Sequence, residues 1–207
     1  PKARKVQWVG NPLRESFKQV PEPATRFAGR SGPLKILVVG GSLGAQALND
    51  VVPKALALIP ADRRPQVVHQ SGARQIDALR ANYGAAGVQA EPVPVIDDMA
   101  RAYADADLGI CRAGATTVTE IAAIGAAGLF VPFPHAVDDH QTTNAKFLVD
   151  QGAGWLIQQR DLTPQGLADL LQKKERSALV QAAQKAKTMQ KTNAVEDVVA
   201  ACEELTA

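Results

Sequence analysis

LKILVV, at residues 34–39, is a short apolar run rich in branched side chains, and GGSLGA follows it directly at residues 40–45. Residues 45–59, AQALNDVVPKALALI, then carry apolar side chains at helical spacing. This stretch therefore predicts a strand, a glycine turn and a helix. The same order recurs along the chain, with further apolar runs at 65–72, 88–96, 108–114, 128–134 and 154–159, each followed by a helical pattern. Six strands alternating with helices predict an α/β fold, in which a parallel sheet carries helices on both faces.

The composition is that of an ordinary globular protein. Of 207 residues, 46% are hydrophobic and 21% are charged, and the net charge is only +2. This balance excludes a disordered chain and argues against binding nucleic acid through bulk charge. Two cysteines and three histidines are too few for a disulfide scaffold, a four-thiolate zinc site or a His-rich metal centre. We therefore expect no metal, no cofactor and no nucleic-acid partner.

The most apolar stretch, residues 121–134, is too short to cross a membrane and is broken by glycine and proline. The first residues, PKARKVQW, lack the apolar core of a signal peptide. These two features predict a cytoplasmic protein with reduced thiols.

The chain divides into two parts in composition. Residues 1–33 are expected to form an N-terminal arm and linker, in which 6–12 fit a strand and 21–33 fit a surface loop. Residues 34–207 are expected to form one domain that ends in two polar helices, at 177–187 and 194–205. Trp8 and Trp155 are expected in the core or half-buried.

Ligands of an open parallel sheet bind at the carboxyl ends of its strands, so the loops there are the candidate sites. In the loop at 40–45, Gly40, Gly41 and Gly44 allow a sharp turn and a close approach to a phosphate, to which Ser42 offers a hydroxyl. Alternatively, Ser42 caps the following helix. The spacing is neither GxGxxG nor that of a P-loop, and no acid ends the next strand, which disfavours a dehydrogenase or a P-loop enzyme.

A second loop opens a helix at Gly114. Backbone N–H groups at Ala115–Thr117 suit a pyrophosphate, and Glu120 suits the vicinal hydroxyls of a ribose. Alternatively, Thr117 and Glu120 form a capping box.

Two further loops carry polar residues. In the loop at 135–144, Gln141 and Asn144 share a helix face and offer amides to sugar hydroxyls, while Asp138 or Asp139 fits a helix cap. His135 and His140 have no partner arrangement that demands acid–base work. In the other loop, Ile96 is expected to end a strand and Asp97 or Asp98 to cap the next helix. Two residues outside these loops have simple interpretations: a solvated arginine for Arg14 and a buried, inert thiol for Cys111.

Together these loops resemble the MurG family, the bacterial peptidoglycan GlcNAc transferases. The resemblance rests on VGNPLR (9–14), VVGGSLGA (38–45), HQSG (69–72), the stretch 95–125 and LFVPFPHAVDDHQTTNA (129–145). It implies the C-terminal domain of a GT-B glycosyltransferase, with a Rossmann-like sheet. It also implies transfer of GlcNAc, with inversion, from UDP-GlcNAc to the undecaprenyl-linked lipid I, which yields lipid II at the cytoplasmic face of the bacterial inner membrane.

The resemblance covers only the donor-binding half of that family. The family's N-terminal half carries a GGTGGH segment that this sequence lacks, and the chain begins with Pro1 rather than Met. The acceptor site, the membrane-facing patch and the catalytic base are expected on that other half, so this chain alone is expected to be inactive.

The resemblance also assigns roles by motif position. It places Arg14 and Ser42 near the diphosphate, the backbone of Ile96 at the uracil, Glu120 at the ribose and Gln141 at the GlcNAc hydroxyls. The segment Ala115, Thr116, Thr117, Val118 and Thr119 presents a helix N-terminus to the phosphates and the sugar. Helix dipoles would then stabilise the departing UDP in place of a metal. Two alternatives stay open: a nucleotide-sugar binding module without activity, and a GT-B enzyme like the UDP-GlcNAc 2-epimerases.

Overall fold

The computed structural model describes residues 7–41, 43–134 and 137–206. Its centre is one parallel sheet of six strands in the order β3-β2-β1-β4-β5-β6. The strands are β1 (Lys35–Val39), β2 (Gln66–Gln70), β3 (Glu91–Val93), β4 (Leu108–Cys111), β5 (Gly128–Phe130) and β6 (Gly154–Leu156). The predicted parallel sheet is confirmed, although most strands are shorter than the apolar runs that indicated them.

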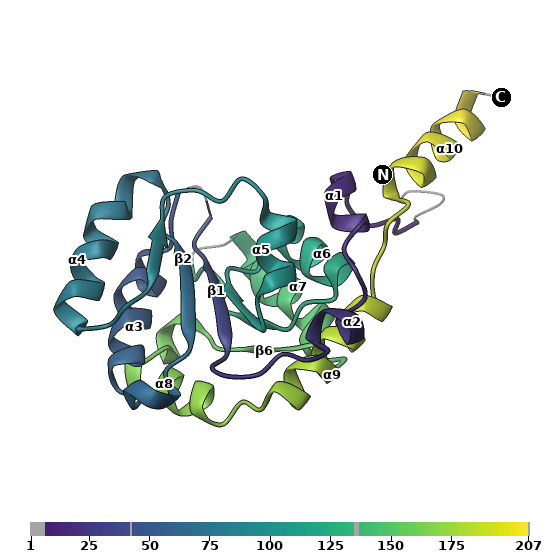
Figure 1. The fold of residues 1–207 in the computed structure, drawn as a ribbon. Coiled ribbons are helices and arrows are strands. Elements are labelled where there is room, and N and C mark those ends of the chain that lie inside the picture. Colours follow the sequence, from purple (N-terminus) through teal and green to yellow (C-terminus); the bar gives the residue numbers. More distant parts are fainter. Residues whose placement is uncertain (1–6, 42, 135–136, 207) are drawn as a thin grey trace.

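The helices cover both faces of the sheet (Figure 1). They are α1 (Glu15–Lys18), α2 (Pro23–Phe27), α3 (Gln46–Ala57), α4 (Ile76–Ala86), α5 (Met99–Asp105), α6 (Ala115–Ile124), α7 (His140–Val149), α8 (Pro164–Gln172), α9 (Arg176–Thr188) and α10 (Ala194–Thr206). Short 3-10 turns lie at Ala61–Arg63, Ala73–Gln75, Val137–Asp139 and Gln159–Asp161. The two predicted C-terminal helices are present as α9 and α10, and α10 extends away from the body in Figure 1.

Alternation along β1 explains why both faces are covered. Ile36 and Val38 pack into a core with α3, α4 and α8, whereas Leu37 and Val39 pack into a second core with α5, α6 and α7. Successive side chains of a strand point to opposite faces, so an all-apolar strand needs a helical layer on each side. Helix α9 contributes residues to both cores.

The N-terminal region differs from its prediction. Residues 7–14 form no strand, and the stretch 21–33 contains α2, whose Phe27 is buried. The side chain of Arg26 donates to the carbonyl oxygens of Pro21, Ala104, Ile124 and Gly125, which fastens this segment to α5 and α6. The polar, Pro- and Gly-rich composition predicted a loop here, because the acceptors on Ala104, Ile124 and Gly125 lie 78 to 99 residues away and leave no local signal.

Both tryptophans lie at the periphery. Trp155 is half-buried, as expected, but Trp8 is 61% exposed, and its ring lies edge-on to Phe147 and 5.1 Å from the Lys191 ammonium. No helix within the described residues combines the length and apolarity needed to cross a bilayer.

Candidate functional site

The sheet order places the two glycine-containing loops side by side. β1 pairs with β4, and Val39 lies opposite Cys111, so the loops that begin at Gly40 and Arg112 leave neighbouring strands at the same edge. Strand order reverses between β1 and β4, and such a reversal opens a crevice at the carboxyl ends of the strands. A cleft of about 770 Å³ lies there. Its lining includes Gly40, Gly41, Gly44, Gln75, Arg112, Phe133, Gln141 and Gln159.

The first loop needs glycine for its geometry. Gly44 has φ +80°, and a side chain there would collide with the carbonyl oxygen of Ser71. Gly41 has φ +78° and open space where a side chain would project. The loop therefore combines a tight packing contact with an open, side-chain-free surface, over which a ligand can approach the backbone. Ser42 lies outside the described residues, and the N-cap of α3 is Ala45, which makes no side-chain capping bond.

Two amide side chains support this loop. Gln75 donates from Nε2 to the Leu43 carbonyl at 3.1 Å, and Asn49 donates from Nδ2 to the Gln75 Oε1 at 2.7 Å. Asn49 is only 3% exposed. Sequence reasoning missed both residues, because each acts across elements and neither belongs to a recognisable local motif.

The second loop ends in an open helix N-terminus. Gly114 is the N-cap of α6, and no side chain of the described residues caps it. The first-turn N–H groups of a helix have no intrahelical partner and carry a partial positive charge, so they suit an anion. Ala115 and Thr116 are exposed here, whereas the side chain of Val118 is buried and its N–H donates to the Gly114 carbonyl at 3.0 Å.

The capping-box interpretation is wrong. Because α6 begins at Ala115, Thr117 lies inside the helix rather than at its N-cap. Glu120 pairs instead with Arg14, whose Nη2 lies 3.3 Å from the Glu120 Oε1. The Glu120 side chain is 12% exposed and that of Arg14 is 59% exposed. Burial raises the pKa of Glu120, and the nearby Arg14 guanidinium opposes that rise. Glu120 is thus a largely buried carboxylate in the second turn of α6, held against the Arg14 guanidinium.

Gln141 and Asn144 share a face of α7, as predicted, but part of their hydrogen-bonding capacity is used by the protein. The Gln141 Oε1 accepts from the N–H groups of Ala113 and Phe133 at 3.2 and 3.0 Å. Asn144 donates from Nδ2 to the Ala113 carbonyl at 3.1 Å. Both amides therefore fasten α7 to the loop that precedes α6. The Gln141 Nε2 makes no hydrogen bond within the described part of the chain and can donate into the cleft.

Arg112 is a cation of the cleft that the sequence analysis left without a role. Its Nη1 donates to the carbonyls of Val131 and Pro132, and its Nη2 donates to the Gln159 Oε1 at 2.6 Å. Burial lowers the pKa of its guanidinium. All these acceptors are neutral, so the positive charge is not cancelled by them and favours an anion in the cleft.

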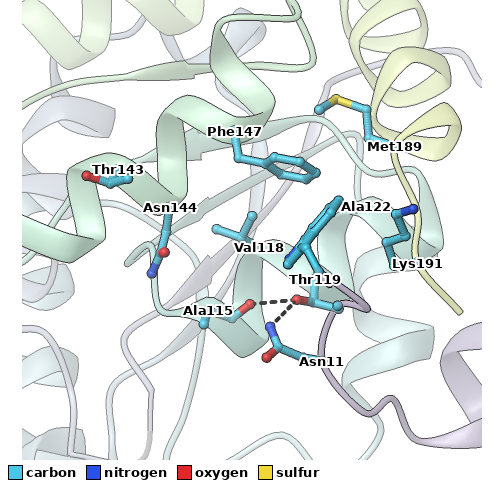
Figure 2. Close-up of a pocket in the computed structure, with 12 residues that line it drawn as sticks. Asn11, Ala115, Val118, Thr119, Ala122, Thr143, Asn144, Phe147, Met189 and Lys191 are labelled. Atoms are coloured by element: carbon cyan, nitrogen blue, oxygen red, sulfur yellow. Dashed lines mark hydrogen bonds between the residues drawn. The ribbon is translucent and has the colours of Figure 1, made fainter. Parts of the chain in front are cut away.

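A second, smaller cavity of about 230 Å³ lies between the N-terminal arm, α6 and α7 (Figure 2). It is lined by apolar groups of Trp8, Val118, Phe147 and Met189 and by the polar side chains of Asn11, Thr119, Thr143, Asn144 and Lys191. Ala115 lines it too, so this cavity reaches the first turn of α6.

The fold agrees with the protein family whose sequence model this chain matches. Residues 35–200 match the glycosyltransferase family 28 C-terminal domain. The chain belongs to this family.

The curated relatives of high sequence identity carry the name of one enzyme. A Polaromonas sp. protein, 73% identical over 202 residues, is named UDP-N-acetylglucosamine--N-acetylmuramyl-(pentapeptide) pyrophosphoryl-undecaprenol N-acetylglucosamine transferase. The match covers 98% of this chain and 52% of the relative. The crystal structure of Acinetobacter baumannii MurG is 43% identical, with a TM-score of 0.84 over 91% of this chain and 55% of that one. The chain thus spans about half the length of the curated relatives it matches.

A more distant likeness concerns the fold alone. UDP-GlcNAc 2-epimerase from Neisseria meningitidis, solved bound to UDP-GlcNAc, has a TM-score of 0.55 at 11% identity. The match covers 92% of this chain and 48% of that one. Together with the sheet topology, these neighbours make the fold that of the GT-B glycosyltransferases, a Rossmann-like α/β domain.

Three further predictions, for Ile96, Asp98 and Cys111, have different outcomes. Ile96 does not end a strand, because β3 stops at Val93; its half-buried side chain packs against the core beneath α5 and α6. Asp98 caps α5 by accepting from the Arg101 N–H, as one alternative predicted. Burial raises the pKa of Cys111 to about 12, consistent with an inert thiol.

The loop before α7 is only partly as predicted. Asp139 occupies the N-cap of α7 with φ +50°, but its Oδ1 accepts from the Thr142 hydroxyl and from no backbone N–H. His135 lies outside the described residues. Among the described residues, no group of three His, Cys, Asp or Glu side chains is arranged to hold a metal ion.

Proposed function

We propose that this chain is the donor-binding half of an inverting glycosyltransferase, which moves GlcNAc from UDP-GlcNAc to lipid I and so forms lipid II for peptidoglycan. One observation carries the proposal: the uncapped N-terminus of α6 and the open glycine loop follow neighbouring strands, and the Glu120 carboxylate belongs to the second turn of that same helix. The name of the 73% identical relative supports this substrate pair.

In the proposed site, different protein groups bind the diphosphate, the ribose, the uracil and the GlcNAc of UDP-GlcNAc. The first-turn N–H groups of α6 and the glycine loop take the diphosphate, with Arg112 and Arg14 as cations and Ser42 as a hydroxyl donor. Glu120 accepts from the ribose hydroxyls, and the backbone near Ile96 contacts the uracil. The Gln141 Nε2 donates to a GlcNAc hydroxyl. These are anion, diol and sugar contacts that each group's chemistry suits.

The reaction requires one displacement. An acceptor hydroxyl oxygen attacks the anomeric carbon while the bond from that carbon to the β-phosphate oxygen breaks, and the bonding electrons leave with UDP. The negative charge that develops on UDP lies at the α6 N-terminus and the guanidinium groups, which stabilise it electrostatically. The base that takes the hydroxyl proton, and the surface that holds the lipid acceptor, belong to the other half of the enzyme. That whole enzyme would act on the cytoplasmic face of the bacterial inner membrane, in wall growth and division.

Transfer experiments test this proposal. This chain alone should give no lipid II from lipid I and UDP-GlcNAc, whereas mixing it with the N-terminal half of a relative, or using the full-length parent, should restore turnover. Turnover by this chain alone would refute the division of labour. A nucleotide-sugar binding module would stay inactive even when the N-terminal half is added. An epimerase would convert UDP-GlcNAc without an acceptor, so incubating the full-length parent with UDP-GlcNAc alone tests that alternative.

A further inference from the structure

The segment before α1 is fastened to α6 by a side-chain hydrogen bond. The Asn11 Nδ2 donates to the Thr119 Oγ1 at 2.8 Å, across 108 residues of sequence (Figure 2). The Thr119 hydroxyl donates its single proton to the Ala115 carbonyl, also at 2.8 Å. Because that proton is used, Thr119 can only accept from Asn11. The amide of Asn11 is therefore held in one orientation.

Arg14 extends from the same segment. It lies three residues after Asn11, and Pro12 between them restricts the backbone. The Arg14 Nη2 reaches the Glu120 Oε1, next to Thr119 on α6, and its guanidinium lies 4.9 Å from the ring of the buried Phe17. A long side chain that is 59% exposed loses conformational freedom when it forms an ion pair. Fixing its backbone on α6 reduces that cost.

We propose that Asn11 is a positioning residue of the UDP-sugar site, which holds residues 11–14 on α6 so that Arg14 stays at the Glu120 carboxylate. The proposal rests on the proposed function, because Glu120 is there the acceptor for the ribose. Asn11 touches no ligand in this account, and its influence passes entirely through Arg14.

The ionisation of Glu120 makes this role measurable. Only the carboxylate accepts from both ribose hydroxyls, and burial disfavours that form while Arg14 favours it. The titratable groups that face Glu120 from other elements are the Tyr103 hydroxyl of α5 and the Cys111 thiol of β4, and burial raises the pKa of both. Burial keeps both groups neutral between pH 5 and 8. The terminal phosphate of UDP ionises at about pH 6 in every titration, so the difference in pH dependence between variants, rather than the profile itself, reports Glu120. Release of Arg14 raises the pKa of Glu120 and moves the loss of UDP affinity to higher pH.

The experiment is a calorimetric titration of UDP into the full chain between pH 5 and 8. It compares the unchanged chain with Asn11→Ala, Arg14→Ala, the double variant and Asn11→Leu, which fills similar space without a donor. Asn11→Ala and Asn11→Leu should each weaken binding about three- to tenfold at pH 7, the range of one lost hydrogen bond. Both should move the pH midpoint upward, as Arg14→Ala does, and the double variant should bind no more weakly than Arg14→Ala. Gln165→Ala is the matched control, because it removes an exposed hydrogen bond that the Gln165 side-chain amide donates to Asp169 on α8.

The outcomes separate the two proposals. If Asn11→Ala weakens binding equally at every pH and its effect adds to that of Arg14→Ala, Asn11 acts only on stability and the inference is wrong. Unchanged affinity in Asn11→Ala, or restored affinity in Asn11→Leu, would also overturn it. If the unchanged chain does not bind UDP, the proposed function itself fails, and this inference falls with it.

Discussion

Replacing Glu120 with glutamine tests the proposed ribose contact. Glu120→Gln keeps the shape of the side chain and one acceptor oxygen but removes the charge that two hydroxyl groups would share. Hydrogen bonds to a charged group contribute about 1.5–3 kcal/mol each, and the amide oxygen retains one weaker bond. The expected loss is therefore about 2 kcal/mol, or roughly thirtyfold in the dissociation constant for UDP.

The same substitution should leave the fold intact. The ion-pair partner of Glu120, Arg14, is 59% exposed, and exposed pairs contribute about 0–1 kcal/mol to stability. For a chain of this length, the melting temperature should change by at most about 4 °C. A large fall in affinity with a small change in melting temperature would thus locate the effect in the site.

The assay is calorimetry with UDP and with 2′-deoxy-UDP at pH 7. Glu120→Gln should weaken UDP strongly and 2′-deoxy-UDP less, because the deoxy ligand already lacks one donor. Asp77→Asn is the matched control, since Asp77 is an acid on α4 that also pairs with an arginine, Arg80, at 3.5 Å. Equal affinities of Glu120→Gln and the unchanged chain for UDP would refute the ribose contact.

Two further predictions concern stability. Gly44→Ala should lower the free energy of unfolding by at least about 2 kcal/mol and the melting temperature by about 4–8 °C, because of the positive φ and the collision with Ser71. Gly84→Ala, in an open, exposed position of α4, should instead add about 0.5–1 kcal/mol in the same melting experiment; a neutral Gly44→Ala would contradict the loop geometry. His69 is fully buried against the Tyr83 hydroxyl, and burial lowers its pKa from 6.5 to about 3. As the pH falls, His69 is therefore protonated in the unfolded chain at a higher pH than in the folded chain. Stability should therefore fall by up to about 1.4 kcal/mol per pH unit as the pH drops from 6.5 towards 3. Urea unfolding should show a shallower pH slope in His69→Phe, and an unchanged slope would exclude His69 as the cause.

The fold could be predicted because its signals are local. Apolar strands, glycine turns and helical periodicity each lie within one short stretch, and their order restricts the sheet to parallel pairing. The ends of elements were less predictable. β3 includes Pro92 and stops at Val93, although the apolar pattern continues to Ile96.

The site could be predicted only in part, for the same reason. The glycine loop and the start of α6 were visible in the sequence, because each is a strand-to-helix junction with small residues. The partners of Glu120, Gln75 and Thr119 were not, since Arg14, Asn49 and Asn11 reach them across 26 to 108 residues. Local spacing therefore predicted a capping box where the structure has a long-range ion pair.

The decisive measurement is a titration of UDP-GlcNAc into this chain, with NAD as the control ligand. One UDP-GlcNAc should bind per chain, saturably and in competition with UDP, and NAD should not bind at the same concentrations. Absence of UDP-GlcNAc binding, or equal binding of NAD, would contradict the claim that these paired loops form a uridine diphospho-sugar site.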